Sequence, residues 1–336
     1  MVFVNKRNHF LDFFRFIAAV GIILVHIKFR GALGSVLASV GLWGVAFFSV
    51  ISGYACHGDN NEVMAAKIIK RLKRAVVITS ITVICYAVFS FFILKSLGKT
   101  DLWIQGFTNP VSYLRMLVLG DFEFFYAGAL WYLVALIYSY VIFYFLVRYK
   151  LRKLIYILTP VTLVFRVIID TYVRSSDVSW HISANWLVGV LPMMLLGYVI
   201  ADQKERLEKL PMSLLITISA ISAAAMMTAS CLRFFNIDIS QVFIILCVTS
   251  VFLTGIRKPD CYICRPIAYL GKEDSLYIYL IHMMVALILR NILNSLPVSP
   301  DTICRLLPVT SVIFSVLAAR LLSIVIKAFR KTFAKS

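Results

Sequence analysis

Charged residues are scarce in this chain of 336 residues. Asp, Glu, Lys and Arg together make up 15% of the sequence, whereas hydrophobic residues make up 61% and the mean hydropathy is +0.90. A soluble domain of this length needs a larger share of charged side chains to cover its surface. The composition therefore excludes a soluble globular protein and indicates a polytopic membrane protein.

Cysteines and glycine-rich motifs are also few. The chain has seven cysteines, and five of them are scattered in or beside apolar segments, where a free thiol behaves as a small apolar side chain. Cys261 and Cys264 form a CxxC pair, but no second pair of zinc ligands lies nearby. No phosphate-cradling glycine loop and no internal repeat is present. The sequence therefore predicts neither a metal site nor a phosphate-binding loop of this kind.

Long apolar runs take up most of the chain. A segment of about 20 apolar residues is long enough to cross the hydrocarbon core of a bilayer. Ten such segments are predicted, at residues 10–28, 36–56, 75–94, 129–147, 154–169, 184–201, 212–232, 240–256, 275–293 and 306–328. The fold class is therefore all-α, a polytopic membrane helical bundle of about ten transmembrane helices.

Acidic residues are outnumbered by basic ones, with 16 Asp and Glu against 34 Lys and Arg and a net charge of +18. If the N-terminus is cytoplasmic, 22 of these 34 cations fall in cytoplasmic segments, 8 in outer segments and 4 within spans. This positive-inside bias predicts that both termini are cytoplasmic. Topology and contact with anionic membrane lipids account for the charge, so no nucleic-acid partner is expected.

The first span, "LDFFRFIAAVGIILVH", carries three ionisable residues: Asp12, Arg15 and His26. At 100° per residue, Arg15 and His26 lie about 20° apart around a helix and roughly 16 Å apart along it. Asp12 precedes Arg15 by one turn and is expected to pair with it. The shared face is typical of a polar passage, and an imidazole suits proton transfer near neutral pH. The alternative is that Arg15 reaches lipid headgroups and His26 bonds a neighbouring helix.

Another group of ionisable residues falls in predicted outer connections: Asp121, Glu123, Asp170, Asp177 and His181. Such side chains are usually solvated in loops, and we expect the same here. The alternative is that one of them binds a sugar or orients His26.

Five short motifs extend over nearly the whole chain. They are "LDFFRFIAAVGIILVH" (Leu11 to His26), "FFSVISGY" (Phe47 to Tyr54), "RLKR" (Arg71 to Arg74), "LWYLVALIYSY" (Leu130 to Tyr140) and "LGKEDSLYIYLIH" (Leu270 to His282). In this order they resemble the motifs of the acyltransferase-3 family of membrane proteins. One departure is Leu136, which stands where one branch of that family carries a Glu, so a mechanism that uses this Glu is not expected here.

The resemblance implies a single integral membrane acyltransferase domain over residues 1–336 in a bacterial cell inner membrane. Members of the family transfer acyl groups from cytoplasmic acyl-CoA, most often acetyl-CoA, to hydroxyls of envelope polysaccharides. The expected partners are therefore the acyl-CoA donor, an envelope glycan or lipid-linked oligosaccharide, and membrane lipids, and no metal cofactor is expected.

The resemblance and the chemistry of ester formation together suggest roles for particular residues. His26 is the natural base for a hydroxyl proton or a transient carrier of the acyl group, and Arg15 is a candidate donor to the thioester oxyanion. Arg71, Arg74 and Lys73 are expected to bind the phosphates of the donor, although a basic cluster beside a span is also a lipid signal. Further candidates for the pocket are Asp12, Ser52, Tyr54, Trp131, Tyr277 and His282.

Two other classes of function fit the same residues. A transporter of a lipid-linked sugar or a small anion would use Arg15, Arg166, Arg290 and Arg320 as counter-charges within the membrane. Such a transporter often has paired inverted repeats, and none is visible. A scaffold of an envelope-assembly complex would tolerate changes at Arg15 and His26.

Overall fold

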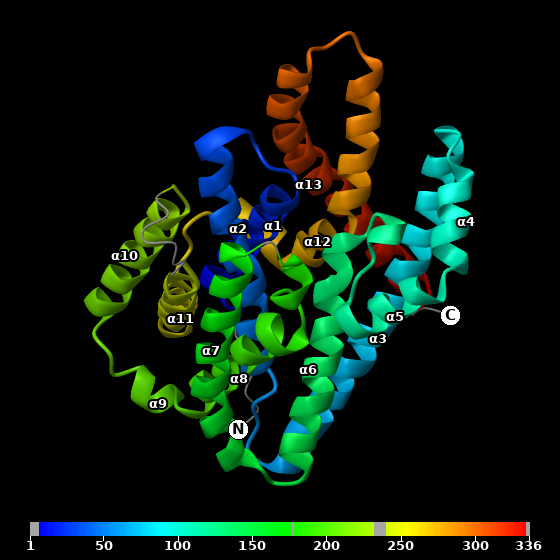
Figure 1. The fold of residues 1–336 in the computed structure, drawn as a ribbon. Coiled ribbons are helices and arrows are strands. Elements are labelled where there is room, and N and C mark those ends of the chain that lie inside the picture. The colour runs from blue at the N-terminus through cyan, green and yellow to red at the C-terminus, as the bar shows by residue number, and fades with distance from the viewer. Residues whose placement is uncertain (1–6, 177, 232–239, 334–336) are drawn as a thin grey trace. The chain divides into compact units, whose positions relative to one another are not determined.

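The computed structural model describes residues 7–176, 178–231 and 240–333, and within them the chain is helical and contains no strand. The α-helices are α1 (His9–His26), α2 (Gly31–Tyr54), α3 (Asn61–Ser96), α4 (Thr100–Thr108), α5 (Pro110–Leu119), α6 (Trp131–Arg148), α7 (Arg152–Ser175), α8 (Leu191–Asp202), α9 (Lys204–Leu207), α10 (Met212–Cys231), α11 (Ser240–Arg257), α12 (Arg265–Ser295) and α13 (Pro300–Phe333) (Figure 1). Four short helices join them: η1 (Glu123–Phe125), η2 (Gly128–Leu130), η3 (Trp180–Ile182) and the π-helix η4 (Trp186–Val190).

Within the described residues, each of the ten predicted spans coincides over most of its length with a helical segment. Among the described residues, eight helices are long and apolar enough to cross a membrane. The helical segments Trp186–Asp202 and Met212–Thr228, which correspond to the sixth and seventh predicted spans, are apolar but shorter. The prediction of an all-α polytopic membrane protein is confirmed.

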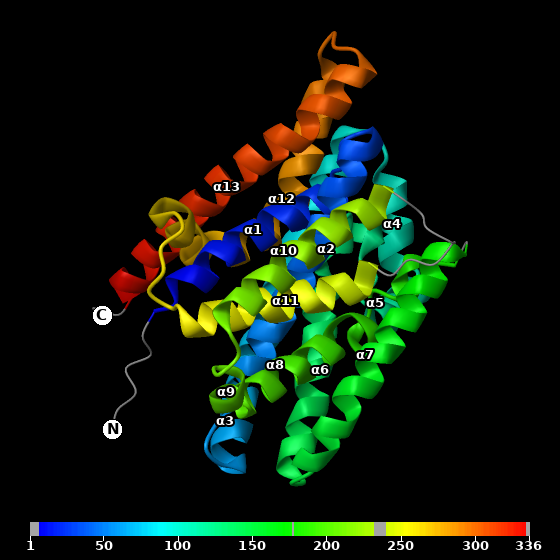
Figure 2. The ribbon, with the colours of Figure 1, turned by 90° about the vertical axis from the view of Figure 1, so that its left-hand side faces the viewer.

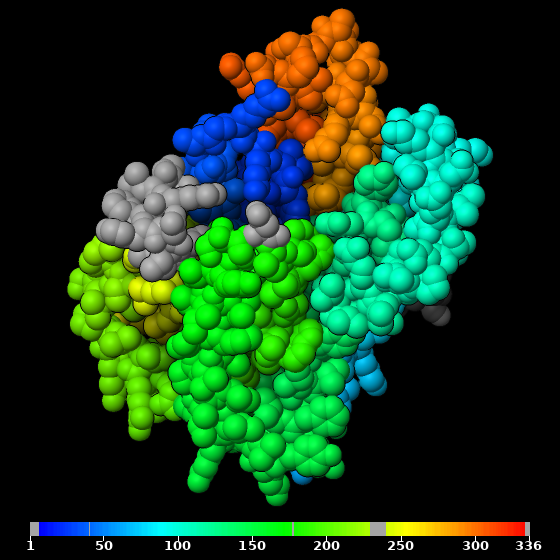
Figure 3. Space-filling model, viewed as in Figure 1, coloured from blue at the N-terminus to red at the C-terminus, as the bar shows by residue number. Residues whose placement is uncertain are grey.

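The helix α7 turns its apolar side outward and its polar side inward. Four exposed side chains recur at helical spacing, Ile157, Val161, Val164 and Ile168, and each is more than half exposed. The buried side chains of the same helix include Thr159, Thr162, Arg166 and Asp170. Because this pattern is the reverse of that in a soluble helix, the outer face of α7, green in Figure 3, is suited to lipid.

The helices α3 and α13 repeat this reversed pattern. The exposed face of α3 carries Val77, Ile81, Ile84, Val88 and Phe92, and its buried face carries Thr79, Thr82, Tyr86 and Ser90. The exposed face of α13 carries Ile313, Leu317, Leu321 and Ile324, and its buried face carries Ser311, Ser315, Ala319 and Ser323. The hydroxyls on the buried faces of α3 at Thr79 and Thr82 donate to backbone carbonyls one turn earlier, which satisfies them without water.

The basic segment before the third span is helical, whereas the sequence placed it in a connection. The Asn60 side chain caps α3 by accepting from the backbone N–H of Val63, and no proline or glycine interrupts the helix up to Ser96. A helix of 36 residues is about 54 Å long, well beyond the hydrocarbon core of about 30 Å. Arg71 and Arg74 therefore lie on a continuous helix rather than in a loop.

The described chain forms two compact units, each built from stretches that are far apart in the sequence. In the unit made of residues 1–47, 208–232 and 246–336, α1 lies between α11 and α12 (Figure 2). Asn8 caps α1 and its side-chain amide donates to the Gly255 carbonyl at the end of α11, at 2.8 Å. The backbone N–H of His9 donates to the Pro259 carbonyl at 2.7 Å. These bonds hold the start of α1 in place.

The other unit contains residues 48–207 and 233–245. In it α3 packs beside α6, and α7 packs beside α8 (Figure 1). Its core is formed mainly by buried side chains from the four helices α3, α6, α7 and α8, among them Met64, Ile68, Phe143, Ile155, Leu195 and Tyr198.

Within this second unit, the end of α2 meets α8 through two glycines. A Cβ atom on Gly53 would lie 1.8 Å from the carbonyl oxygen of Met194, and one on Gly197 would lie 2.1 Å from that of Val50. Backbone atoms cannot move aside as a flexible side chain can, so both positions require glycine. Gly53, which follows Ser52 in "FFSVISGY", is therefore a packing residue.

We expect Gly53→Ala and Gly197→Ala to destabilise the protein because each methyl group would overlap a backbone carbonyl. Overpacking of this kind costs about 1–3 kcal/mol, which lowers the melting temperature by several degrees. Thermal unfolding of the detergent-purified variants measures the effect. Gly128→Ala is the matched control, since a Cβ there meets nothing closer than 3.8 Å. Equal melting temperatures for all three variants would contradict the proposed contact.

Candidate functional site

The helices α1 and α12 run parallel and in close contact. At one end, a Cβ on Gly271 would lie 1.8 Å from the backbone oxygen of Asp12. At the other end, the ring centroids of His26 and His282 are 5.5 Å apart. Asp12 precedes His26 on α1 as Gly271 precedes His282 on α12, so the two helices run in the same direction. The close approach at Gly271 therefore sets the register that brings the two imidazoles together.

The two imidazoles differ in their surroundings. His282 is fully buried, and its Nδ1 lies 2.7 Å from the carbonyl oxygen of Tyr279. A carbonyl only accepts, so Nδ1 carries the proton and Nε2 presents a lone pair. No hydrogen-bond partner of that Nε2 is found among the described residues. His26, the last residue of α1, is half-buried, so it is the more exposed residue of the pair.

Near the opposite end of α1, Asp12 forms ion pairs with two arginines. The Asp12 carboxylate is buried and accepts from Arg15 Nη1 at 2.8 Å and from Arg7 Nε at 3.1 Å. The predicted pair of Asp12 and Arg15 is therefore present. One third of the Arg15 side chain stays exposed, which leaves the guanidinium able to contact a ligand.

Tyr277 does not join the imidazole pair. It precedes His282 by five residues, which places it about 140° away around α12. Tyr279 is the closer neighbour, because it lies three residues before His282 and its ring centroid is 6.2 Å from that of the imidazole.

In the second unit, Ser52 lies between two buried tyrosines that the sequence did not single out. Ser52 contacts the hydroxyls of Tyr132 and Tyr140, and Arg71 also contacts the hydroxyl of Tyr140. The Ser52 hydroxyl donates to the Phe48 carbonyl at 2.8 Å. A chain of polar groups thus leads from Tyr132 through Ser52 and Tyr140 to Arg71. Only the pairing of α2, α3 and α6 could bring it together.

The three basic candidates on α3 differ in exposure. Arg71 is half-buried by its contact with Tyr140, whereas Lys73 and Arg74 are exposed. Tyr54 is the last residue of α2 and is half-buried. Arg74 and Lys73 are therefore the cations of this group that are free of the protein interior and open to an anionic ligand.

Trp131 has a packing role in the structure. It is the first residue of α6, and its ring lies so close to Gly189 that a Cβ there would be 2.9 Å from it. Gly189 belongs to the π-helix η4, so the indole occupies the space that the missing side chain leaves.

Three of the four arginines that a transporter would need as counter-charges are already compensated. Arg166 donates from Nε to Gln241 at 3.0 Å and from Nη1 to the Gly189 carbonyl at 2.6 Å. Arg320 lies 3.6 Å from the Asp274 carboxylate. Arg15 is paired with Asp12. Of the four arginines, only the exposed Arg290 therefore has no such partner among the described residues.

The outer acidic residues correct an expectation. Asp121, Asp170 and His181 are buried rather than solvated, and Glu123 alone is exposed as predicted. Asp170 lies inside α7, which extends to Ser175, and accepts from Gln241 at 2.9 Å and from Arg174 at 2.5 Å. Burial is possible because these partners replace water. Asp177 lies outside the described residues.

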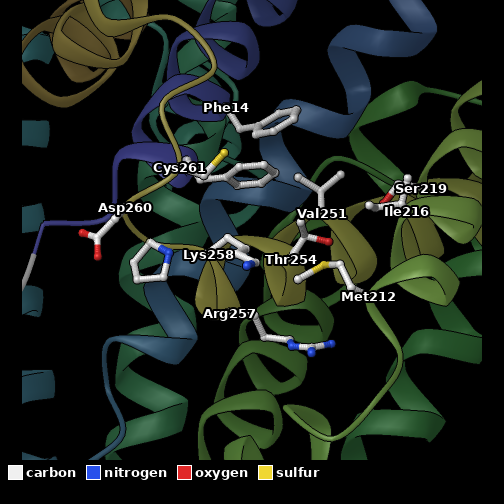
Figure 4. A pocket seen from close by; sticks show the side chains of 12 residues that line it. Phe14, Met212, Ile216, Ser219, Val251, Thr254, Arg257, Lys258, Asp260 and Cys261 are labelled. Atoms are coloured by element: carbon white, nitrogen blue, oxygen red, sulfur yellow. The ribbon is translucent and has the colours of Figure 1, made fainter.

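The first unit also contains a cavity of about 760 Å³ with mainly apolar walls (Figure 4). Phe14, Met212, Val251 and Cys261 line it, and Arg257 and Lys258 lie at its edge. The cavity contacts the start of α1, whereas His26 is the last residue of that helix. It is therefore separate from the imidazole pair.

Cys56 is expected to be unreactive, although it lies near Arg71. Burial raises the pKa of its thiol to about 12, even with Arg71 and Lys67 nearby to favour the thiolate. Since the thiolate is the reactive form, maleimide at pH 7.5 should label the exposed Cys261 and leave Cys56 unmodified. Mass spectrometry of the labelled, folded protein measures both. Labelling of Cys56 as fast as Cys261 would contradict the buried environment.

Comparison with protein families adds a separate observation. The acyltransferase-3 family, described as an acyltransferase domain, matches residues 8–328. The match includes both imidazoles, the pair of Asp12 and Arg15, and the basic start of α3. No curated protein and no solved structure matches the chain. Because the family match covers nearly the whole length, the chain belongs to the acyltransferase-3 family and is a membrane acyltransferase.

Proposed function

We propose that the protein transfers an acyl group, acetyl in the first instance, from acyl-CoA to a hydroxyl of an envelope polysaccharide or lipid-linked glycan. The observation that carries the proposal is the pair of imidazoles at the end of α1 and α12, in a chain of the acyltransferase-3 family. The proposed location is a bacterial cell inner membrane, where both the cytoplasmic donor and the envelope glycan are within reach.

His26 is proposed as the base. The acceptor hydroxyl loses its proton to His26 while its oxygen attacks the thioester carbonyl carbon. The carbon–sulfur bond then breaks, and the proton passes from His26 to the leaving thiolate, which departs as CoA. The position of His282 supports this role, since its ring centroid is 5.5 Å from that of His26 and the packing of the two rings helps to orient the His26 imidazole.

Arg15 is proposed to contact the charged part of the donor. It lies 11 residues before His26, which is roughly 16 Å along α1 and too far for both to act on one carbonyl. Coenzyme A carries its phosphates at the far end of a long pantetheine arm from the thioester. Asp12 holds the guanidinium in place, so Arg15 is preorganised for an anion.

Arg71, Arg74 and Lys73 are proposed as further donor-binding cations. The exposure of Arg74 and Lys73 at the basic start of α3 supports contact with an anionic ligand from the cytoplasm. Ser52, Tyr54 and Trp131 are proposed to shape the surroundings rather than to take part in bond making, since Ser52 is bonded to backbone and Trp131 fills space at Gly189.

An NMR assay of ester-linked acyl groups on surface glycans of the host tests the activity. Three strains are compared: gene-deleted, complemented with wild type, and complemented with His26→Ala at matched membrane abundance. We expect the ester signal only with wild type, because without the imidazole the hydroxyl proton has no acceptor.

The same assay separates the two parts of the proposal. An ester signal in the His26→Ala strain would remove His26 from catalysis while keeping the transferase. Absence of ester in every strain, together with no binding of acyl-CoA to the purified protein, would overturn the proposed donor and acceptor.

Donor binding by α3 is tested with Arg74→Gln. Loss of a charge-assisted hydrogen bond to phosphate costs about 1.5–3 kcal/mol. We therefore expect a rise of about 10- to 100-fold in KM for acyl-CoA, with kcat little changed, in a steady-state assay of the purified enzyme.

Arg148→Gln is the matched control, because Arg148 is an exposed arginine on another inner connection in the topology predicted from the sequence. An equal rise in KM for the control would point to a general effect of charge. Unchanged KM for both variants would exclude Arg74 from the donor site.

A further inference from the structure

Three potential metal ligands meet in the second unit, from connections that are far apart in the sequence. Asp121 and Glu123 lie between α5 and α6, and His181 lies in η3 between α7 and η4. One ligand atom from each of the three lies within 4.8 Å of the others. The sequence indicated no metal site here, because about 60 residues separate the imidazole from the carboxylates and no short motif links them.

The spacing of these atoms suits a small tetrahedral ion. The Nε2 atom of His181 lies 3.4 Å from Asp121 Oδ2 and 3.9 Å from Glu123 Oε1. Two ligands of a zinc ion with bonds of about 2.0–2.1 Å lie about 3.3–3.4 Å apart. Small side-chain movements of the exposed Glu123 are enough to complete the geometry.

The burial of the His181 imidazole is a second observation that points to a ligand. Its side chain is only 5% exposed, and neither ring nitrogen has a hydrogen-bond partner among the described residues. A buried imidazole without a partner is unfavourable, because it has lost its bonds to water and gained none. The contact of its ring with Trp180, with centroids 3.9 Å apart, helps to hold it in this position.

Asp121 is fixed in an orientation that leaves one oxygen facing the imidazole. Its Oδ1 accepts from the backbone N–H of Glu123 at 2.9 Å. Its Oδ2 faces His181 and also lies 2.5 Å from Arg115 Nη2. Arg115 is half exposed, so it is able to leave Oδ2 when a cation binds.

We propose that Asp121, Glu123 and His181 form a zinc-binding site that joins the two connections in which they lie. An imidazole with two carboxylates is a ligand set for a borderline metal such as Zn²⁺, whereas Mg²⁺ and Ca²⁺ prefer oxygen alone. Water occupies the fourth position. Because the ligands come from both connections, the bound ion stabilises the native state of this unit.

Zinc binding is measured by calorimetry and by metal analysis after buffer exchange. The full-length protein is purified with a tag free of histidine, in a Cys261→Ser, Cys264→Ser background that removes the CxxC pair. We expect one zinc per chain in wild type and a rise in melting temperature of at least about 3 °C at saturating zinc.

His181→Gln is expected to weaken zinc binding by at least about 10- to 100-fold and to abolish the shift in melting temperature. Its melting temperature without metal serves to show that the variant is folded. Arg115→Ala is expected to bind zinc at least as tightly as wild type, because the competing guanidinium is gone. If Asp121 forms only structural ion pairs with His181 and Arg115, neither His181→Gln nor Arg115→Ala binds zinc.

His57→Gln is the matched control for adventitious binding. His57 also faces a carboxylate in the same unit, but its Nε2 bonds Asp202 at 3.0 Å, and Asp202 is shared with Arg152 and Tyr156. Wild-type stoichiometry and affinity are expected for this control. Zinc binding by His181→Gln equal to wild type, an equal loss in His57→Gln, or equally tight binding of Mg²⁺ would overturn the proposal.

Discussion

The helices of this protein turn apolar side chains outward and polar ones inward, and the other features described here depend on that arrangement. The pattern on α3, α7 and α13 is stable only where hydrocarbon replaces water around the molecule. A charge on the inner face then has no water to bond, so it needs a partner from the protein. Asp12 with Arg15, and Arg166 with Gln241, Asp170 and the carbonyls of η4, meet this requirement.

Close backbone contacts between helices determine where the buried polar groups meet. In the absence of a hydrophobic driving force between helices in lipid, small residues allow the approach that gives packing energy. Gly271 lets α12 lie against α1 at Asp12, and the parallel course of the two helices then places His282 beside His26. The membrane-facing pattern, the glycine contact and the imidazole pair are therefore linked physically, although they are read from different parts of the chain.

Several features of the molecule follow from local pattern and could be predicted. The span positions, the all-α class and the pairing of Asp12 with Arg15 depend on residues within about 20 positions of one another, where helical geometry alone sets the spacing. The same local view was wrong about Asp121, Asp170 and His181, which are buried. The prediction of solvated side chains considered only neighbours in the sequence. The residues that these side chains meet are distant, since Gln241 is 71 residues from Asp170 and Asp121 is 60 residues from His181. The local view also placed Arg71 to Arg74 in a connection before the third span, whereas these residues lie inside α3. Hydropathy marks the part of a helix that crosses the membrane and not the whole length of the helix.

By itself, the sequence determined that the protein is a helical membrane protein, where its spans lie, and through five ordered motifs that it resembles the family to which it belongs. Only the tertiary structure decided which polar groups meet: His26 with His282, Ser52 with Tyr132 and Tyr140, and His181 with two carboxylates. The physical reason is that hydropathy and helical period are properties of a single segment. A buried polar group, by contrast, is satisfied by whichever segment packing brings beside it, and that choice depends on the contacts of the whole chain.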